Sequence, residues 1–500
     1  MPPSEIDNMD ERLTIPGKIR RCEWIVGWGT VFLLVFSPLA FGAVETWAWI
    51  TVAAGCFLIA GTERYRRYLL VRLSPPPGDI PFPASRPVAD YLLCGFGILF
   101  LLGPLVQLIP LPVSLVSAVS PRTARYWLLT GRVTSGSWTV FSLYPSRTAG
   151  ELVRLASYGA IFYALKGYRP AGRGRTAFTA RLLTAVIATG FVISVIGILQ
   201  KYSWQGMIYW LRPIRFGNPF GPFVNRNHFA GYIIMVIPLA LGLLLTRRPR
   251  PPGETFRDRI VRSDPRRFLL GFMVLVMAVA LFLSYSRSGI MAGILAFIYL
   301  IGISRYFRLI DRRQALVIFG SSLVLITLVL AYFGTADLFA RFETVGGGGA
   351  EVEYRLDIWR DTVRIYRDYP VLGIGLGGFE KFYPYYKSFR RRKPFTHAEN
   401  DYIQVAAEMG TWGLAGLAGF FLAFFGSVVS WKPGRNPIVR PRNPPGGWLI
   451  SGRGLVAGCS AGALGLILQS SLNFNFAIPA NTLLLAVLLA LASGRIFPGR

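Results

Sequence analysis

The chain has 500 residues, of which 53% are hydrophobic and only 16% are charged, and its formal net charge is +29. This composition excludes an ordinary soluble globular protein, in which about 25% of residues are charged. The positive charge does not indicate nucleic-acid binding, because Lys and Arg gather in the cytoplasmic loops of membrane proteins, where they resist translocation. The sequence therefore predicts a polytopic all-α membrane protein that contacts lipid and no nucleic acid.

Apolar runs of about 17–25 residues, the length that spans a bilayer as a helix, recur along the whole chain. The segments between alternate runs are strongly basic, for example 63–72, 166–181 and 247–267. Since such segments mark cytoplasmic loops, both termini are predicted to be cytoplasmic. About twelve spans are predicted, near 24–43, 46–62, 90–110, 150–167, 182–199, 229–246, 268–284, 289–304, 315–333, 406–430, 454–473 and 479–495.

These spans divide the chain into four expected parts. They are a cytoplasmic tail over 1–23, membrane helices within 24–333, an outer loop domain over 334–405, and three further spans with a short cytoplasmic tail over 406–500. The four cysteines lie in the inner tail or within spans, so neither a disulfide nor thiol chemistry is expected. The sequence has no Cys/His cluster and no phosphate-binding glycine loop with its lysine, so neither a metal nor a cofactor is expected.

Asn225, Arg226, Asn227 and His228 stand at the outer end of the span expected at 229–246. An asparagine at this place can simply cap the helix. A cap does not account for the neighbouring arginine, nor for one of only two histidines in the chain. The four residues are therefore candidates for substrate binding.

Arg287 lies at the tip of a very short outer turn, in the stretch SYSRSGIM over 284–291. A charge at the membrane boundary is unfavourable and usually faces a partner or a water-filled cavity. The arginine could instead extend to lipid phosphates, with its aliphatic stem along the apolar surface. Both interpretations remain open on the local sequence.

The longest outer segment, 334–405, begins with a predicted helix over 351–370. Leu356, Trp359, Val363 and Tyr366 recur in it at helical spacing and predict one apolar stripe, and Arg355 is one of several arginines at other positions. The glycine-rich stretch over 371–379 follows a helix rather than a strand. It is therefore not a dinucleotide-binding motif.

The outer segment ends in THAENDYIQVAAEMGTWG, over 396–413. Thr396 and Glu399 have the spacing of a capping box, which would place His397 in the first turn of the helix that follows. From there Asn400, Gln404 and Glu408 recur at helical spacing. A purely structural helix entering lipid would not carry such a polar stripe, so this face is expected to line a site.

The expected site thus has arginines and histidines at one membrane surface. Arginine binds phosphate oxygens in bidentate fashion and keeps its charge, and an imidazole can accept a proton near neutral pH. This combination suits a lipid-linked phosphate or diphosphate handled outside the cytoplasm. A transporter or flippase is the rival class, but its charges should lie near the bilayer midplane in broken helices.

The stretches GPFVNRNHFAGY, SYSRSG, YRLDIWRDTVRIYRDYPVLGIGLGGF and THAENDYIQVAAEMGTWG, in this order, resemble the O-antigen ligase family, which includes related polymerases. The resemblance implies a metal-independent glycosyltransferase without a cofactor, with a GT-C-like helical membrane fold of the bacterial inner membrane. A helical periplasmic loop domain would cover a site that faces the periplasm. The implied donor is a glycan on undecaprenyl diphosphate, and the implied acceptor is lipid A–core for a ligase or another lipid-linked repeat unit for a polymerase. Glycan transfer onto protein is a further alternative.

By the same resemblance, His397 matches the proposed catalytic base, and Arg226 and Arg287 match the arginines proposed to hold the diphosphate. Arg355 could assist them, while Gln404 and Glu408 could orient the base or bind sugar hydroxyls. The chain departs from many relatives at Glu399, where they carry a second histidine. This departure leaves the identity of the acceptor open.

Overall fold

The computed structural model describes residues 3–73, 88–131, 133–134, 136–170, 174–203, 207–214, 217–246, 264–321, 349–389, 395–431 and 451–494. In this part of the chain, sheet is confined to two antiparallel pairs of two-residue strands. The strand β1 (Leu111–Pro112) pairs with β2 (Trp138–Thr139), and β3 (Met207–Ile208) pairs with β4 (Arg212–Pro213). The prediction of an all-α fold is confirmed.

The long helices are α1 (Pro3–Leu39), α2 (Thr46–Leu73), α3 (Val88–Leu108), α6 (Pro145–Lys166), α7 (Gly174–Ser203), α8 (Arg226–Leu244), α10 (Pro265–Leu283), α11 (Arg287–Tyr306), α14 (Gly349–Asp368), α16 (Asp401–Val429), α17 (Gly452–Gln469) and α18 (Pro479–Ser493). Shorter elements are η1 (Phe41–Ala43), α4 (Val113–Val119), α5 (Pro121–Leu129), α15 (Phe379–Phe382) and η2 (Tyr383–Tyr385). Each expected span falls on one of the long helices, except 315–333, most of which lies outside the described residues.

Among the described residues, seven helices are long and apolar enough to cross a membrane. They are α1 from Ile15 onward, α3, α7 from Ala177 onward, α8, α10, α11 and α16. The shorter helix α18 is apolar but has only 15 residues. The chain is therefore a multi-pass helical membrane protein, while the expected number of about twelve spans stays a prediction.

The centre of the bundle is the pair α8 and α17. Most of the α8 span is buried inside the protein. The helices approach so closely that a Cβ atom on Gly458 would lie 2.8 Å from the carbonyl oxygen of Pro238, and one on Gly462 would lie 2.5 Å from that of Met235. In lipid, where apolar surface gains little from association, such contacts between small residues are a main source of helix packing.

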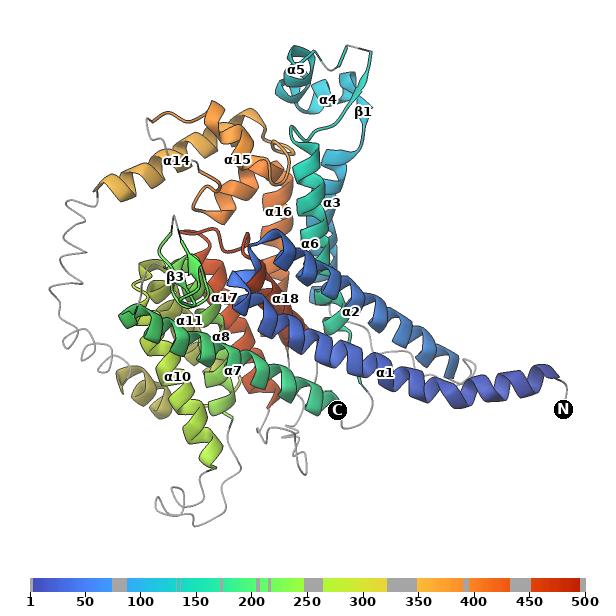
Figure 1. Cartoon of the computed structure of the whole chain (residues 1–500), viewed down its shortest axis with the longest axis vertical. Coiled ribbons are helices and arrows are strands. Elements are labelled where there is room, and N and C mark those ends of the chain that lie inside the picture. The colour runs from blue at the N-terminus through green and yellow to red at the C-terminus, as the bar shows by residue number, and fades with distance from the viewer. Residues whose placement is uncertain are drawn as a thin grey trace.

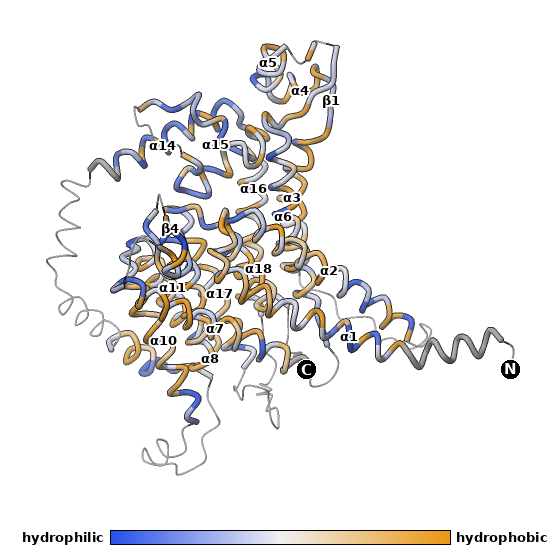
Figure 2. The backbone as a smooth tube through the Cα atoms, viewed as in Figure 1, coloured by the Kyte–Doolittle hydropathy of each residue, from blue (hydrophilic) through white to orange (hydrophobic). Residues whose placement is uncertain are grey.

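Two outer segments lie at one end of the bundle, which we call the site end (Figure 1). The first contains β1, α4, α5 and β2, and the second contains α14 and α15. Hydrophilic residues are concentrated in the second segment and hydrophobic ones in the bundle (Figure 2). Leu372 packs with Val113 and Phe141 between the two segments, and Arg147 pairs with Glu380 at 3.3 Å.

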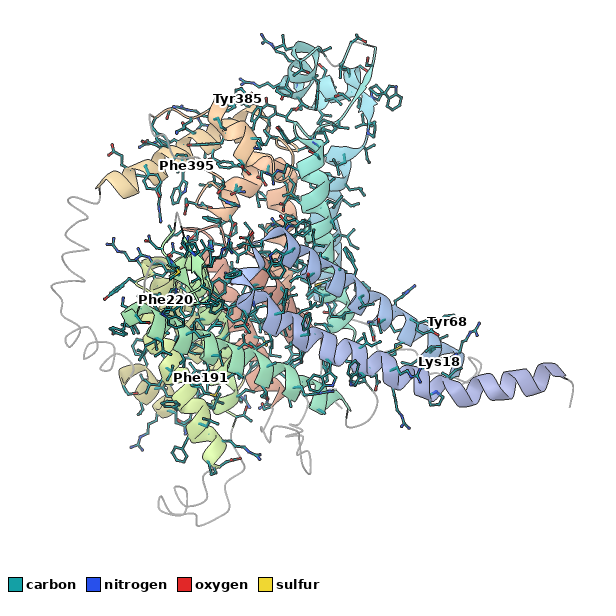
Figure 3. The ribbon with its side chains drawn as sticks, in the orientation of Figure 1. Lys18, Tyr68, Phe191, Phe220, Tyr385 and Phe395 are labelled. Carbon is teal, nitrogen blue, oxygen red and sulfur yellow. The ribbon has the colours of Figure 1, made fainter. Side chains whose placement is uncertain are left out.

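The buried face of α14 differs from the stripe predicted from the sequence. Ile358, Asp361, Thr362 and Ile365 are fully buried, whereas Leu356 is 40% exposed. The Asp361 carboxylate is accommodated because it accepts hydrogen bonds from the Ser388 N–H at 2.9 Å and the Tyr383 hydroxyl at 3.3 Å. The apolar pattern of the sequence predicts the wrong buried face, because the face that is buried contains a carboxylate whose hydrogen bonds are satisfied. Phe395 and Tyr385, labelled in Figure 3, belong to the same outer segment.

The helix α16 is interrupted at Gly410, whose φ is +63°. The glycine-rich segment 371–378 packs against this break. The N–H groups of Ile374 and Gly375 donate to the carbonyls of Ala407 and Glu408, each at 3.0 Å, and the Thr411 N–H donates to the Pro370 carbonyl at 2.7 Å. Gln107 of α3 donates to the Glu408 carbonyl at 2.8 Å. The backbone groups released by the break are thereby satisfied by protein, as non-helical backbone at membrane depth requires.

We expect Gly373→Ala to destabilise the protein, because Gly373 has a φ of +71° and a Cβ there would lie 2.3 Å from the Glu408 carbonyl carbon. Backbone strain of this kind costs about 1–3 kcal/mol before the steric overlap is added. Thermal unfolding of the purified protein in detergent should show a lower midpoint. The matched control is Gly426→Ala in α16, where a Cβ meets nothing within 4 Å. An unchanged midpoint for Gly373→Ala would contradict the close approach of the segment to α16.

Candidate functional site

The segment that precedes α16 carries His397. The helix begins at Asp401, and the Asn400 side chain caps it by accepting from the N–H groups of Tyr402 at 3.0 Å and Ile403 at 3.2 Å. The predicted capping box of Thr396 and Glu399 is wrong, because Asn400 is the N-cap of α16 and Glu399, just before it, has a left-handed φ of +55°. His397 therefore lies before the helix rather than in its first turn.

Arg226 and Arg287 are the first residues of α8 and α11. The Ser286 hydroxyl donates to the Asn227 side-chain oxygen at 2.8 Å, so the two helix N-termini are held together. Asn225 caps α8 by accepting from the Asn227 N–H at 2.9 Å, as one interpretation of the sequence predicted. Two adjoining helix N-termini, each of which begins with an arginine, favour a bound anion.

The turn between α17 and α18 connects to both of these N-termini. Gln469 donates to the Asn227 carbonyl at 3.0 Å, and Asn473 donates to the Ser288 hydroxyl at 2.6 Å. From the start of α18, Asn481 donates to the His228 carbonyl at 3.1 Å. These buried amides fix the positions of the residues beside the two arginines.

Phe474, in the same turn, lies between the two imidazoles. The His397 ring stacks on the Phe474 ring at a centroid distance of 4.2 Å and an interplanar angle of 5°. The His228 ring meets it edge-on at 4.6 Å and 78°. The two histidines of the chain thus converge, although the sequence analysis did not find Phe474. The only signal for it is the alternation of asparagine and phenylalanine over 473–476 in this turn.

Asp401 holds this turn against the start of α16. Its carboxylate accepts from the Phe476 N–H at 3.0 Å, and its own N–H donates to the carbonyls of Ser470 at 2.9 Å and Asn473 at 3.2 Å. The local sequence around Asp401 does not indicate this role. Through these bonds it fixes Phe474 relative to His397.

The His397 imidazole is neutral at physiological pH. Burial lowers its pKa to about 3, and the positive charge of Arg154 on α6 acts in the same direction. Its Nδ1 lies 2.9 Å from the Thr396 hydroxyl oxygen. In the tautomer whose Nδ1–H donates to this oxygen, Nε2 is the nitrogen that can accept a proton.

Gln404 and Glu408 support this segment from α16. Gln404 accepts from the Ala398 N–H at 3.1 Å and donates to Glu408 at 3.3 Å. Glu408 is buried and accepts from the N–H groups of Gly377 at 2.9 Å and Phe379 at 3.1 Å. These contacts favour the orienting role that the sequence left open over direct contact with sugar hydroxyls.

Arg355 lies on α14 and is partly buried. Its neighbour Tyr354 packs against Phe395, two residues before His397, with ring centroids 6.2 Å apart. Arg355 is thereby near the segment that carries His397. Among the described residues there is no group of three or more His, Cys, Asp or Glu side chains that could hold a metal ion.

The chain is thus a multi-pass membrane protein whose two histidines converge on Phe474, in a turn that is bonded to the starts of α8 and α11. Residues 272–418 match the family model described as O-Antigen ligase. This match, which includes Arg287, Arg355 and His397, supports assignment of this part of the chain to the O-antigen ligase family, a glycosyltransferase-like enzyme family of ligases and polymerases. Asn225–His228 precede the matched residues. No curated protein matches the chain.

We expect Glu408→Ala to loosen the glycine-rich segment, because the buried N–H groups of Gly377 and Phe379 lose their acceptor. An unsatisfied buried polar group costs about 1–3 kcal/mol. Amide hydrogen exchange over 373–379 should accelerate by about tenfold or more, since 1.4 kcal/mol corresponds to tenfold.

The control for this measurement is Glu380→Ala. The Glu380 carboxylate follows the same segment, pairs with Arg147 and is more exposed than that of Glu408. A surface change of this kind should alter stability by no more than about 0.5 kcal/mol. Equal exchange rates in both variants would show that Glu408 does not hold the segment.

Proposed function

We propose that this protein transfers a glycan from undecaprenyl diphosphate to an acceptor hydroxyl at the periplasmic face of the bacterial inner membrane, and that the acceptor is lipid A–core. The observation that carries the proposal is the convergence at Phe474. The His397 ring stacks on it, and the turn that contains it is bonded to the α8 and α11 N-termini, where Arg226 and Arg287 stand. The proposal thereby assigns a proton acceptor and two diphosphate-binding cations to one site.

In the proposed reaction the acceptor hydroxyl oxygen attacks the anomeric carbon of the donor sugar. The bond from this carbon to the diphosphate oxygen breaks, and undecaprenyl diphosphate leaves with both bonding electrons. The hydroxyl proton passes to Nε2 of His397. Arg226 and Arg287, with the positive ends of the α8 and α11 helix dipoles, stabilise the charge that develops on the leaving group. A single displacement inverts the anomeric configuration.

The proposed reaction requires no metal ion, because two guanidinium groups take the place of the cation that would otherwise neutralise the leaving diphosphate. It also requires the site end of the bundle to face the periplasm. The basic segments 63–72 and 247–267, which are predicted to be cytoplasmic loops, would then lie on the opposite side of the membrane. Under this orientation the segment 334–405 forms the periplasmic loop domain. Elongation of a lipid-linked repeat unit uses the same chemistry, so the acceptor alone separates a ligase from a polymerase.

We expect His397→Ala to lower glycan transfer by about 10²–10⁴-fold while donor binding is kept, since this is the usual contribution of a general base. Arg287→Ala should weaken both donor binding and turnover, and Arg287→Lys should restore little because the bidentate fork is lost. His228→Ala should be milder than either, since that ring lies edge-on against Phe474.

These variants are compared in vesicles with the purified full-length chain, in excess chelator, with lipid A–core and a lipid-linked repeat unit offered as separate acceptors. Transfer to lipid A–core identifies a ligase, and elongation of the repeat unit identifies a polymerase. Near wild-type transfer by a normally folded His397→Ala would exclude His397 as the base. Activity that is lost in chelator and restored by magnesium would exclude the arginine mechanism.

The pH dependence of kcat/KM supplies a separate test, because it reports groups of the free enzyme. The pKa of His397 is lowered to about 3 by burial and by Arg154, so the imidazole is protonated only as the pH falls through that value. We therefore expect no acid limb from this group between about pH 5 and 8, whereas an unperturbed histidine would give one near pH 6.5. A limb near 6.5 that is absent in His397→Gln would show that the ring is solvated in the working enzyme.

A further inference from the structure

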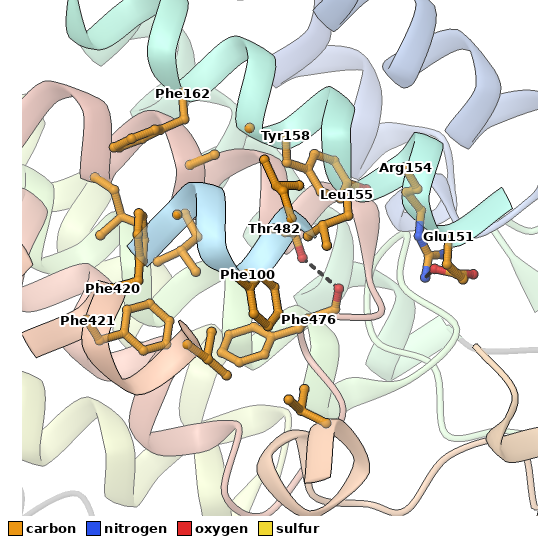
Figure 4. A pocket seen from close by; sticks show the side chains of 18 of the residues that line it. Phe100, Glu151, Arg154, Leu155, Tyr158, Phe162, Phe420, Phe421, Phe476 and Thr482 are labelled. Atoms are coloured by element: carbon orange, nitrogen blue, oxygen red, sulfur yellow. Dashed lines mark hydrogen bonds and ion pairs between the residues drawn. The ribbon is translucent and has the colours of Figure 1, made fainter. Parts of the chain in front are cut away.

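An apolar pocket of about 190 Å³ lies between the helix pair α3 and α6 and the pair α16 and α18. Its walls are aromatic and aliphatic, and include Phe100, Phe162, Phe420 and Leu489. Figure 4 shows that charged side chains gather at one end only, where Arg154 and Glu151 of α6 form an ion pair. A pocket that is apolar along its length and polar at one end fits an amphiphile.

The polar end of this pocket adjoins the segment that carries His397. The positive charge of Arg154, at this end of the pocket, contributes to the lowered pKa of His397. Phe476, which lines the pocket, follows Phe474 by two residues in the turn that contacts His397. A molecule in the pocket would therefore have its head group next to the proposed base.

The pocket is separate from the proposed diphosphate site. No described residue that lines it belongs to α8 or α11, the helices that begin with Arg226 and Arg287. The donor would reach His397 from these two N-termini, and the occupant of the pocket would reach it from α6. The pocket is thus suited to the second substrate.

The polar end favours a sugar over a second diphosphate. Arg154 is paired with Glu151, and their side chains are 23% and 25% exposed. An ion pair of this kind offers a hydroxyl group one donor and one acceptor side by side, whereas the Glu151 carboxylate would repel the negative charge of a diphosphate.

We propose that this pocket binds an acyl chain of a glycolipid acceptor, with a sugar of its head group at Glu151 and Arg154 and the reacting hydroxyl directed to His397. This inference rests on the proposed glycan transfer and specifies its acceptor. Moving an acyl chain from the bilayer into an apolar pocket gains little free energy, because lipid tails are equally apolar. The pocket therefore orients the acceptor, and its loss should reduce turnover through the lost positioning.

The test fills the pocket from two walls, with Val405→Trp on α16 and Gly159→Leu on α6, where a Cβ meets only the Leu101 side chain at 3.2 Å. The matched control is Val153→Trp on α6, where the side chain is 47% exposed. The full-length variants are reconstituted in vesicles, with lipid A–core as the acceptor probe. Binding of radiolabelled undecaprenyl diphosphate is measured in parallel.

We expect both filling variants to reduce transfer to lipid A–core by about tenfold or more, while undecaprenyl diphosphate binding changes less than about twofold and Val153→Trp behaves as wild type. A parallel loss of undecaprenyl diphosphate binding would assign the pocket to the donor chain and overturn the inference. Unchanged transfer in both filling variants would show that only bilayer lipid occupies it.

Failure of the proposed function would give a different result. A wild-type protein that transfers glycan to no acceptor refutes the reaction itself, whereas one that elongates a lipid-linked repeat unit but leaves lipid A–core unmodified refutes only the glycolipid acceptor. Arg154→Gln adds a check on the head group. It should reduce transfer to lipid A–core and leave undecaprenyl diphosphate binding unchanged, whereas unaltered transfer would remove Arg154 from the head-group contact.

Discussion

The break in α16 at Gly410 is the feature on which the arrangement of the site depends. Within an apolar helix, released carbonyl and N–H groups must find partners in the protein, because lipid offers none. Here the glycine-rich segment and Gln107 supply those partners. The same contacts bring Glu408 within reach of the N–H groups of Gly377 and Phe379. The hydrogen bonds made by the backbone groups at this break thus fix the glycine-rich segment against the first turns of α16. Through Gln404 they also fix the segment that carries His397.

The cluster at the site end is held mainly by neutral hydrogen bonds. Side chains of Asn, Gln and Ser connect the N-termini of α8 and α11 to the turn between α17 and α18, and Asp401 connects this turn to α16. These bonds fix the starts of α8 and α11, where Arg226 and Arg287 stand. Fixed positions are what the proposed electrostatic stabilisation of the leaving group requires.

The two imidazoles have different surroundings, although they contact the same phenyl ring. His228 is buried at the start of α8 and touches the edge of Phe474. His397 lies in the segment before α16, with its face on the ring and its Nδ1 next to Thr396. An imidazole kept neutral by burial is a weaker base than a solvated one. In the proposed reaction, the acceptor must therefore be positioned well enough to compensate for the low basicity, which is consistent with a separate pocket that orients it.

The sequence by itself determined the class of protein, since runs of apolar residues with basic segments between them leave no alternative to a helical membrane protein. It also determined which residues are candidates for the site, because charged side chains at the ends of apolar helices are unfavourable without a partner. It did not determine the start of α16, because Asn400 and the Thr396/Glu399 pair are both acceptable caps and only the left-handed turn at Glu399 selects between them. Only the tertiary structure decided that Phe474 and Asp401 belong to the site, since their roles depend on contacts between segments far apart in the chain. The buried face of α14 was decided in the same way, because Asp361 is satisfied by partners that no local pattern reveals.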